Sequence, residues 1–343
     1  MEEVYARARR RKHGPLGEVM RTLRMTGAVF FDTNAYAPWV SETPNSAEFG
    51  RILFPRAEHV IPFHVIIEGA CWAEVPGAGE PVLLREGGVM IAPRGDFHVL
   101  ASAPGLRESA PAGLGDYYEA VQRDRPLFAA LNGGEDHPLS CRFICGFIGC
   151  DVAPFNPLLN ALPGLIVGEV AASNFGVLAS LLDQAVGEDD AKAPDGDSAL
   201  AKMAEFLFIE VLRQYVADLP EETGGWFAGL RDRQVGAALR LLHDRPAESW
   251  TIEKLAREVG LSRSGFAQRF TFFVGVAPMT YLARWRMQMA ARLLDDEATS
   301  VGQAAIAVGY ESEAAFHRTF KRHVGVSPGH WRRDRNARLA LRS

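Results

Sequence analysis

The sequence predicts an α+β chain, in which an antiparallel β-barrel with flanking helices is followed by an all-α domain. With 343 residues, of which 48% are hydrophobic, the chain is long enough for about two domains with separate cores. Residues 50–150 alternate short apolar runs with turn residues, which is typical of antiparallel strands. Beyond residue 250 one helical pattern occurs twice, which indicates a duplicated structural unit.

Three apolar segments are the clearest strands of the N-terminal half. They are HVIIEGACWAEV (64–75), PVLLREGGVMIAP (81–93) and CRFICGFIGC (141–150), broken by the turn-forming stretches PGAGEP, EGG and PRGD. Period-two alternation places His64 and Glu68 on one face of the first strand. The same alternation places Cys141 and Cys145 on one face of the third strand, which can face the barrel interior together with His64 and His98.

A long apolar helix is expected between the two halves. The segment 198–220 (SALAKMAEFLFIEVLRQYVADLP) follows a polar loop at 188–197. Its apolar face, between Leu200 and Val216, is too wide for a helix that stands alone in water. The helix must therefore pack on the β-rich half or on a second copy of the chain.

The repeat near the C-terminus can be measured from residue offsets. Phe266, Phe270, Gly275 and Pro278 recur 50 positions later as Phe316, Phe320, Gly325 and Pro328. Ile252, Ala256, Val259 and Gly260 recur 49 positions later as Val301, Ala305, Val308 and Gly309. The second copy thus holds one additional residue between Gly309 and Phe316.

Each copy predicts a helix, a tight turn and a second helix. The expected N-caps are Thr251, Ser262, Ser300 and Ser312, and the expected glycine stops are Gly260 and Gly309. The second helices are predicted at about 263–273 and 313–324. A linking helix over 280–294 would be about 22 Å long, which can set two such helices about one turn of B-DNA apart.

The second helix of each copy presents small or polar side chains outward, as does a helix that enters a DNA major groove. The outward residues are Arg263, Ser264, Ala267, Gln268 and Thr271 in the first copy, and Glu313, Ala314, His317, Arg318 and Lys321 in the second. The phenylalanines at four-residue spacing are instead expected in the core. Within this set, Gln268 and Arg318 are the expected base readers.

Charge divides the chain in the same place. Residues 231–343 hold 19 Lys and Arg against 11 Asp and Glu, about +8, while the rest of the chain is about −13. This asymmetry indicates a basic module that meets a polyanion, although surface charge can also drift between domains. Arg284, Arg286, Arg322, Arg332 and Arg333 are either phosphate contacts or solvated surface, and Arg322 and Arg332 are the expected phosphate contacts.

The span from about Asp232 to Arg335 resembles the DNA-binding domain of the AraC/XylS family of bacterial transcription regulators. The signature lies in AIAVGYESEAAFHRTFKRHVGVSPGHWRR, with Ala305, Gly309, Phe316, Phe320, Lys321, Gly325, Ser327, Pro328, Trp331 and Arg332 at the expected places. Trp331 replaces a more usual Tyr, and Ala277 stands where the first unit commonly has Ser. The resemblance implies two helix-turn-helix units joined by a helix.

The N-terminal half resembles the cupin-type sensor domain found ahead of many such DNA-binding domains. The stretch GGVMIAPRGDFHVL fits the second cupin motif, with Gly87, Pro93, Gly95 and His98 in register. The first motif is incomplete, because Ile66 stands where a second His would join His64 and Glu68. The resemblance therefore argues against a metal-dependent enzyme, although Zn or another divalent metal at His64, His98 and Cys145 stays open.

Alternatives remain for the polar residues of the barrel. His64 and His98 are either satisfied core residues or, with Glu68 and Cys145, a ligand site. The cysteines are either small core residues or a zinc or thiol redox sensor. The segment RARRRKH near the N-terminus is a solvated tail or an additional phosphate-binding arm.

The sequence as a whole predicts a ligand-responsive or redox-responsive transcription regulator without enzyme activity. The expected divisions are a sensor domain over 1–195, an interdomain or dimerisation helix over 196–230, a DNA-binding domain over 231–335 and a basic tail over 336–343. The expected partners are duplex promoter DNA, a second copy and RNA polymerase, with activation the expected sense. The rival interpretations are a cupin enzyme fused to a DNA-binding module and an effector-independent DNA-binding dimer. No membrane span or signal peptide is expected, so the predicted location is cytoplasmic.

Overall fold

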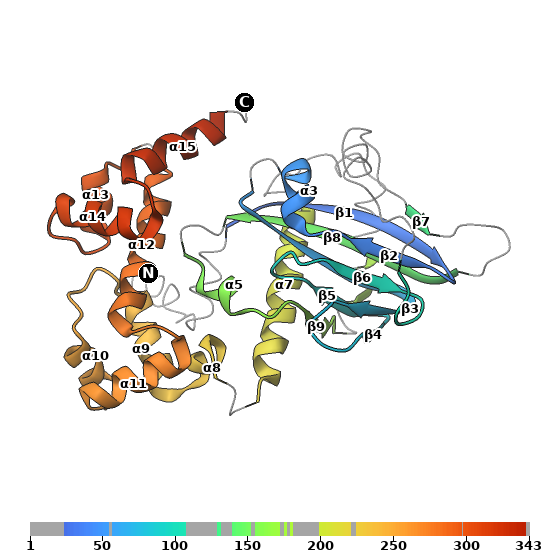
Figure 1. The fold of residues 1–343 in the computed structure, drawn as a ribbon, viewed down its shortest axis with the longest axis horizontal. Helices are drawn as coiled ribbons and strands as arrows, with labels where there is room; N and C mark the ends of the chain where they lie inside the picture. The colour runs from blue at the N-terminus through green and yellow to red at the C-terminus, as the bar shows by residue number, and fades with distance from the viewer. Residues whose placement is uncertain are drawn as a thin grey trace, which may run out of the picture. The chain divides into compact units, whose positions relative to one another are not determined.

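The structure is a computed structural model that describes residues 24–54, 57–107, 129–131, 139–151, 155–171, 175–176, 179–180, 199–220, 224–296 and 298–340. It divides into two compact units. We call residues 24–152 and 162–218 the sheet unit, and residues 153–161 and 219–343 the helical unit (Figure 1). The basic RARRRKH segment lies outside the described residues.

The sheet unit confirms the predicted strands and adds a long one before them. Its strands are β1 (Arg24–Tyr36), β2 (Val40–Thr43), β3 (His59–Glu74), β4 (Val82–Arg85), β5 (Gly88–Ile91), β6 (His98–Ala101), β7 (Ala129–Leu131), β8 (Leu139–Asp151) and β9 (Ile166–Glu169). The order is β2-β6-β3-β8-β1-β7, with β4, β5 and β9 off this path. The described strands form an open sheet and not the closed barrel expected, and β7 pairs with β1 in parallel.

The pairing of β3 with β8 fixes which side chains share a face. His64 lies directly opposite Cys145, and the register shifts between Ile66 and Glu68, which is the sign of a β-bulge. Gly69 follows with φ +78°, and a Cβ there would lie 2.2 Å from the carbonyl oxygen of Ser140. The bulge reverses the alternation, so residues before and after it swap faces.

Helix α7 (Ala199–Asp218) is the long apolar helix that the sequence predicted, and it packs on its own sheet. It lies against β9, β1 and β8 (Figure 1). Leu207, Phe208 and Val211 are buried there. The Gln214 side chain accepts from the Glu169 N–H at 2.9 Å and donates to the Glu169 carbonyl at 2.7 Å, which fixes the helix to β9.

The helical unit confirms the duplicated helix-turn-helix pattern. Its helices are α5 (Pro157–Ala161), α8 (Trp226–Arg231), α9 (Arg233–Asp244), α10 (Ile252–Glu258), α11 (Arg263–Val274), α12 (Pro278–Leu294), α13 (Val301–Ala307), α14 (Glu313–Val324) and α15 (Pro328–Ala340). All four expected N-caps accept a backbone N–H three residues on. Helix α15 extends into the segment expected to be a basic tail.

Helix α12 joins the two helix-turn-helix units by burying side chains toward both. Near its start, Tyr281 packs edge-on against Phe270 of α11, with ring centroids 5.8 Å apart. Near its end, Met287 and Leu294 belong to the core formed with α13 and α14. The helix begins at Pro278 and its 17 residues span about 25 Å. Among the described residues, no helix combines the length and apolar character that crossing a bilayer would require.

The two glycine stops offer a matched test of the turns. Gly309 has φ +85°, and a Cβ there would lie 2.4 Å from the Ala247 carbonyl oxygen. Gly260 has φ +72° but no atom within 4 Å of such a Cβ. We expect Gly260→Ala to lower the free energy of unfolding by about 1 kcal/mol, the cost of a left-handed residue with a side chain. Gly309→Ala should cost about 1–3 kcal/mol more, because backbone atoms must move.

Urea denaturation of the full chain, followed by tryptophan fluorescence, measures both costs. Equal losses for the two variants would show that the contact at Ala247 does not constrain the second turn.

Candidate nucleic-acid interface and buried histidine-cysteine cluster

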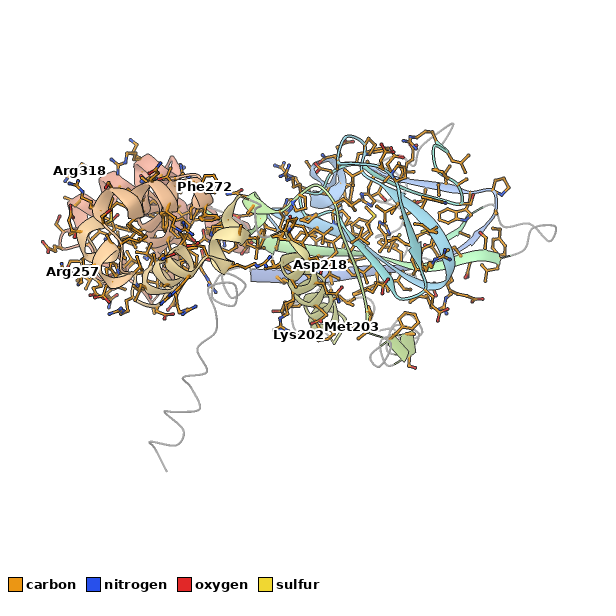
Figure 2. The ribbon with its side chains drawn as sticks, turned by 90° about the horizontal axis from the view of Figure 1, so that it is seen from below. Lys202, Met203, Asp218, Arg257, Phe272 and Arg318 are labelled. Carbon is orange, nitrogen blue, oxygen red and sulfur yellow. The ribbon has the colours of Figure 1, made fainter. Side chains whose placement is uncertain are left out.

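Helices α11 and α14 present their predicted polar residues to solvent. Arg263, Ser264, Gln268, Glu313, Arg318, Lys321 and Arg322 are exposed, and His317 is half-buried. Arg318 stands at the outer surface of the helical unit (Figure 2). The aromatic residues on the same helices, Phe266, Phe270, Phe316 and Phe320, are fully buried. The geometry thus separates a packing face from a face that can enter a groove.

The exposed cations of α14 are free of ion pairs within the described part of the chain. Arg318, Lys321 and Arg322 are exposed on one side of the helix. None of the three forms an ion pair with an Asp or Glu side chain of the described residues. On α11, in contrast, Arg269 places Nε 3.1 Å from Asp232 Oδ2, and Arg263 places Nε 2.9 Å from Glu253 Oε1. The second helix-turn-helix unit therefore presents more unpaired positive charge on its exposed helix than the first helix-turn-helix unit does.

Two arginines considered as phosphate contacts are held inside the unit. Arg286 donates to the carbonyl oxygens of Pro246 at 2.7 Å and Glu248 at 2.8 Å. Arg332 is half-buried and donates to the Thr299 carbonyl. Both guanidinium groups thus donate hydrogen bonds to backbone carbonyls, which is a structural role. The spacing of residues in the sequence could not show it.

The sheet unit brings together three of the four predicted ligand-site residues. His64 Nε2 lies 2.7 Å from His98 Nε2, and Cys145 Sγ lies 3.0 Å from His64 Nδ1. His98 Nδ1 lies 3.0 Å from the carbonyl oxygen of Asp96, and the Thr33 side chain also hydrogen-bonds the Cys145 thiol. Both imidazoles are fully buried. Thr33 had no signal in the sequence, because it lies far from Cys145 along the chain. Asp96 lies two residues before His98, but it takes part through its backbone carbonyl, which no sequence motif marks.

The hydrogen positions in this cluster follow from one fixed acceptor. The Asp96 carbonyl can only accept, so His98 donates from Nδ1. Burial lowers the pKa of His98 to about 4, and burial together with His98 lowers the pKa of His64 well below its ordinary value, so both rings are neutral. His98 Nε2 therefore accepts from His64 Nε2–H, and His64 Nδ1 accepts from the Cys145 thiol. We call this chain, from Cys145 to the Asp96 carbonyl, the relay.

The relay does not fit a single metal ion. His98 and Cys145 engage opposite nitrogens of the His64 ring, so the three do not converge on one point. Within the described residues, no group of three His, Cys, Asp or Glu side chains is placed to hold a metal. Ile66, in the position of the missing cupin histidine, is fully buried in the apolar core.

The expectation that Glu68 shares a face with His64 is wrong. Glu68 is exposed, because the bulge after Ile66 turns it to the opposite face of β3. The paired expectation for Cys141 and Cys145 holds, since both pack in the same core as Cys71. A hydrogen bond with Cys141, and then burial, raises the pKa of Cys71 far above its ordinary value. Desolvation raises the pKa of Cys145 to about 12, so these thiols are neutral.

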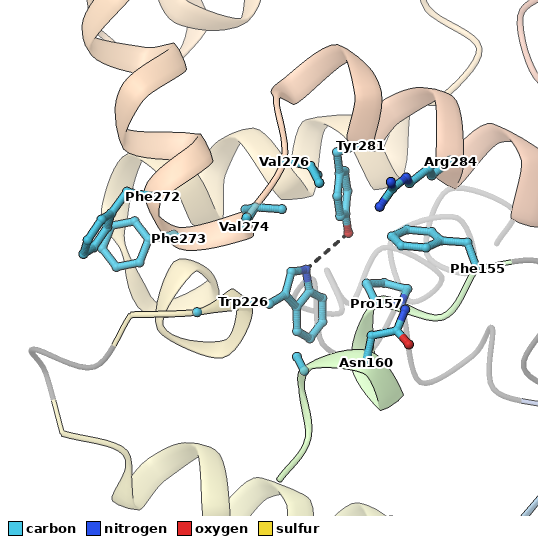
Figure 3. Close-up of a pocket in the computed structure, with 13 residues that line it drawn as sticks. Phe155, Pro157, Asn160, Trp226, Phe272, Phe273, Val274, Val276, Tyr281 and Arg284 are labelled. Carbon is cyan, nitrogen blue, oxygen red and sulfur yellow. Dashed lines mark hydrogen bonds between the residues drawn. The ribbon is translucent and has the colours of Figure 1, made fainter. Parts of the chain in front are cut away.

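The helical unit also contains a cavity that the sequence did not indicate. Its volume is about 310 Å³, and Phe155, Trp226, Phe273, Tyr281 and Arg284 are among its lining residues (Figure 3). The Trp226 Nε1–H donates to the Tyr281 hydroxyl at 3.3 Å. The Phe155 N–H donates to Gln288 Oε1 at 2.8 Å, which ties the segment before α5 to α12.

The lowered pKa values of the relay predict acid sensitivity. Between about pH 6.5 and pH 4 the unfolded chain protonates His64 and His98, whereas the folded chain keeps them neutral. The unfolded state therefore binds more protons, and the free energy of unfolding falls as pH falls through this window. For His98 the loss is up to about 3 kcal/mol by pH 4, at about 1.4 kcal/mol per pKa unit.

Urea denaturation at several pH values in this window measures the free energy of unfolding of the wild type and of histidine variants. His98→Gln should flatten the pH dependence, while the control His330→Gln should leave it unchanged, because the His330 side chain is 50% exposed. The same pH dependence in the wild type and His98→Gln would contradict a neutral buried His98.

Comparison with known proteins agrees with both units. A cupin family model matches residues 14–217, and a helix-turn-helix domain model matches residues 255–334. An AraC-like transcription regulator of Streptomyces lividans is 32% identical over 278 residues, covering 81% of this chain and 88% of the relative. The transcriptional regulator AlkR of Acinetobacter baylyi is 28% identical over 281 residues, covering 81% and 89%. These relatives are named as regulators and not as enzymes, which agrees with the expectation.

Two solved structures cover very different shares of the chain. The DNA-binding domain of AdpA, in complex with a target DNA, is 31% identical, covers 31% of this chain and 96% of its own, and has a TM-score of 0.30. ToxT from Vibrio cholerae O395 is 10% identical, covers 91% and 97%, and has a TM-score of 0.31. From the cupin match and the Streptomyces relative, the chain belongs to the AraC/XylS family of DNA-binding transcription regulators, with a cupin-type domain ahead of its helix-turn-helix domain.

Proposed function

We propose that this regulator binds promoter DNA in a sequence-specific manner and changes transcription in response to a small effector or a redox signal sensed in the sheet unit. The observation that carries the proposal is the relay, a chain of hydrogen-bonded polar groups among the apolar residues of the sheet unit's core. Buried polar groups are costly unless every one is satisfied, so a core without a role for them would be built more simply from apolar residues.

The DNA-binding part of the proposal assigns roles to the exposed residues of α11 and α14. Gln268 and Arg318 read base edges, because amide and guanidinium groups can form paired hydrogen bonds in the major groove. Lys321 and Arg322, one turn further along α14, bind phosphate. Ser264 and His317 lie on the same exposed face and supply additional contacts. Arg332 is a weaker candidate for phosphate, because the Thr299 carbonyl occupies one of its donors.

The sensing part assigns the response to His64, His98 and Cys145. A ligand or an oxidant that engages any of the three must break at least one hydrogen bond of the relay. The cost of leaving a buried group unpaired, about 1–3 kcal/mol, is large enough to shift a conformational equilibrium tenfold. Glu68, exposed on the opposite face, is left out of this site.

The partners beyond DNA are a second copy and RNA polymerase. For the second copy, α7 offers Phe206, which is 47% exposed on the side of the helix away from its buried residues. Met203 is half-buried on the same side, and Lys202 is exposed beside it (Figure 2). Sedimentation velocity of the wild type and Phe206→Ser would show whether copies pair through this face.

Two arginines of α14 test the assigned DNA contacts. Arg318→Ala should weaken binding to the specific site by about 1–3 kcal/mol and relax the base preference at one position. Arg322→Ala should weaken all sequences alike and lower the slope of log affinity against log salt by about 1, since one phosphate contact is lost.

Fluorescence anisotropy of the full chain on its operator and on random duplex, at several salt concentrations, measures both effects. Equal losses on specific and random DNA for the two variants would refute the division into a base reader and a phosphate contact.

Variants at Cys145 separate the two kinds of signal. Cys145→Ser keeps a hydrogen-bond donor to His64 but loses the thiol, whereas Cys145→Ala loses both. If a small effector acts through the relay, the serine variant should respond and the alanine variant should not. If thiol oxidation is the signal, neither should respond. His64→Ala and His98→Ala should abolish the response in either case while operator affinity stays within about twofold.

Reporter output and operator affinity, measured on folded protein, decide between these outcomes. A wild-type response in all four variants would show that the relay only stabilises the fold and does not sense the signal.

A further inference from the structure

Helices α11 and α14, which we call the recognition helices, begin with side chains of opposite charge at equivalent positions. Ser262 and Ser312 cap α11 and α14, and the first residue of each helix is Arg263 in one and Glu313 in the other. The two residues are 50 positions apart, the same offset that relates the buried phenylalanines of the repeat. Their side chains are 71% and 57% exposed, so packing does not explain either choice.

The surroundings of the two residues change together with their charge. In the first unit Glu253 of α10 holds Arg263, with Nε 2.9 Å from Oε1. The 49-residue offset makes Gly302 of α13 the equivalent of Glu253. A Cβ at Gly302 would lie 3.1 Å from Glu313 Oε2, so the glycine leaves room for the second carboxylate. An acid on the supporting helix of the first unit is thus replaced by an acid on the recognition helix of the second.

Glu313 is oriented by its own helix. Its Oε1 lies 3.5 Å from Nε2 of His317, one turn further along α14. The exposed cations Arg318, Lys321 and Arg322 lie beyond His317 on the same helix. A carboxylate at this end of a DNA-facing helix repels phosphate, so it lowers affinity for DNA of any sequence. An acid in the first turn does favour the helix dipole, but only by about 0.3–1 kcal/mol.

In the major groove a carboxylate can accept a hydrogen bond from the exocyclic amino group of cytosine. An arginine can donate to the O6 and N7 acceptors of guanine. We propose that Glu313 selects cytosine, and Arg263 guanine, at equivalent positions of the two halves of the binding site. This inference rests on the proposed DNA-binding role of α11 and α14, and it implies that the operator is not a direct repeat.

Selection of duplexes from a randomised library by the full chain tests the inference. The wild type should enrich sites with cytosine at one position and guanine at the equivalent position of the other half. Glu313→Gln should lose the cytosine preference and accept adenine, which glutamine can pair with. Glu313→Arg, which copies the first unit, should enrich guanine there. Replacing the cytosine should weaken wild-type binding about tenfold or more, and Glu313→Gln binding by about twofold or less.

Glu311→Gln is the matched control, because it removes the same charge from an exposed residue just outside the helix. Both glutamine variants should bind random DNA more tightly, but only Glu313→Gln should change a base preference. If the wild type selects a site and Glu313→Gln selects the same one, the inference is wrong and Glu313 serves the helix end alone. If the wild type selects no sequence at all, the proposed function itself fails.

Discussion

The burial of α12 on two sides is the constraint on which the helical unit depends. Its first turns pack against Phe270 of α11 through Tyr281, whose hydroxyl also meets Trp226 Nε1 and His243 Nε2. Its last turns complete the core of α13 and α14. Because one rigid helix contributes to both cores, neither helix-turn-helix unit can be displaced without disturbing the other. The two recognition helices therefore act as one body.

Within that body the repeat has kept its packing and changed its chemistry. The phenylalanines, serine caps and glycine stops recur, and the phenylalanines are fully buried in both copies. The exposed residues do not recur: Arg263, Gln268 and Phe272 stand where the second copy has Glu313, Arg318 and Arg322. The charge follows the same division: the α11 cations Arg263 and Arg269 are paired, whereas Arg318, Lys321 and Arg322 of α14 have no ion pair with a carboxylate in the part of the chain that the structure describes. The two copies thus share their buried aromatic residues and differ in the side chains that they expose.

The sequence predicted much of this arrangement and missed what depends on register or distant contacts. The helix-turn-helix pattern was predictable because caps, stops and apolar spacing are local signals. The bulge that exposes Glu68 was not, because a single additional residue on β3 leaves no mark on a pattern of period two until its partner strand is known. Strand β1 was missed, since apolar and polar residues do not alternate regularly along it. The hydrogen bonds of Arg286 and Arg332 to carbonyl groups, and the hydrogen bond of Thr33 to Cys145 beside the relay, arise from contacts between segments far apart in the chain.

The hydrogen bonds of the relay can run in only one direction, from the Cys145 thiol to the Asp96 carbonyl. Its last acceptor is a peptide carbonyl, which has no proton to give, so the three hydrogen bonds cannot reverse direction together in the way that a chain of hydroxyl groups can. A tautomeric flip of either histidine would leave two lone pairs, or two protons, facing each other across 2.7 Å. The cluster therefore cannot hold a signal as an alternative proton arrangement with the side chains in place. A second neutral arrangement of the relay must therefore move atoms heavier than hydrogen, so it differs from the first in shape.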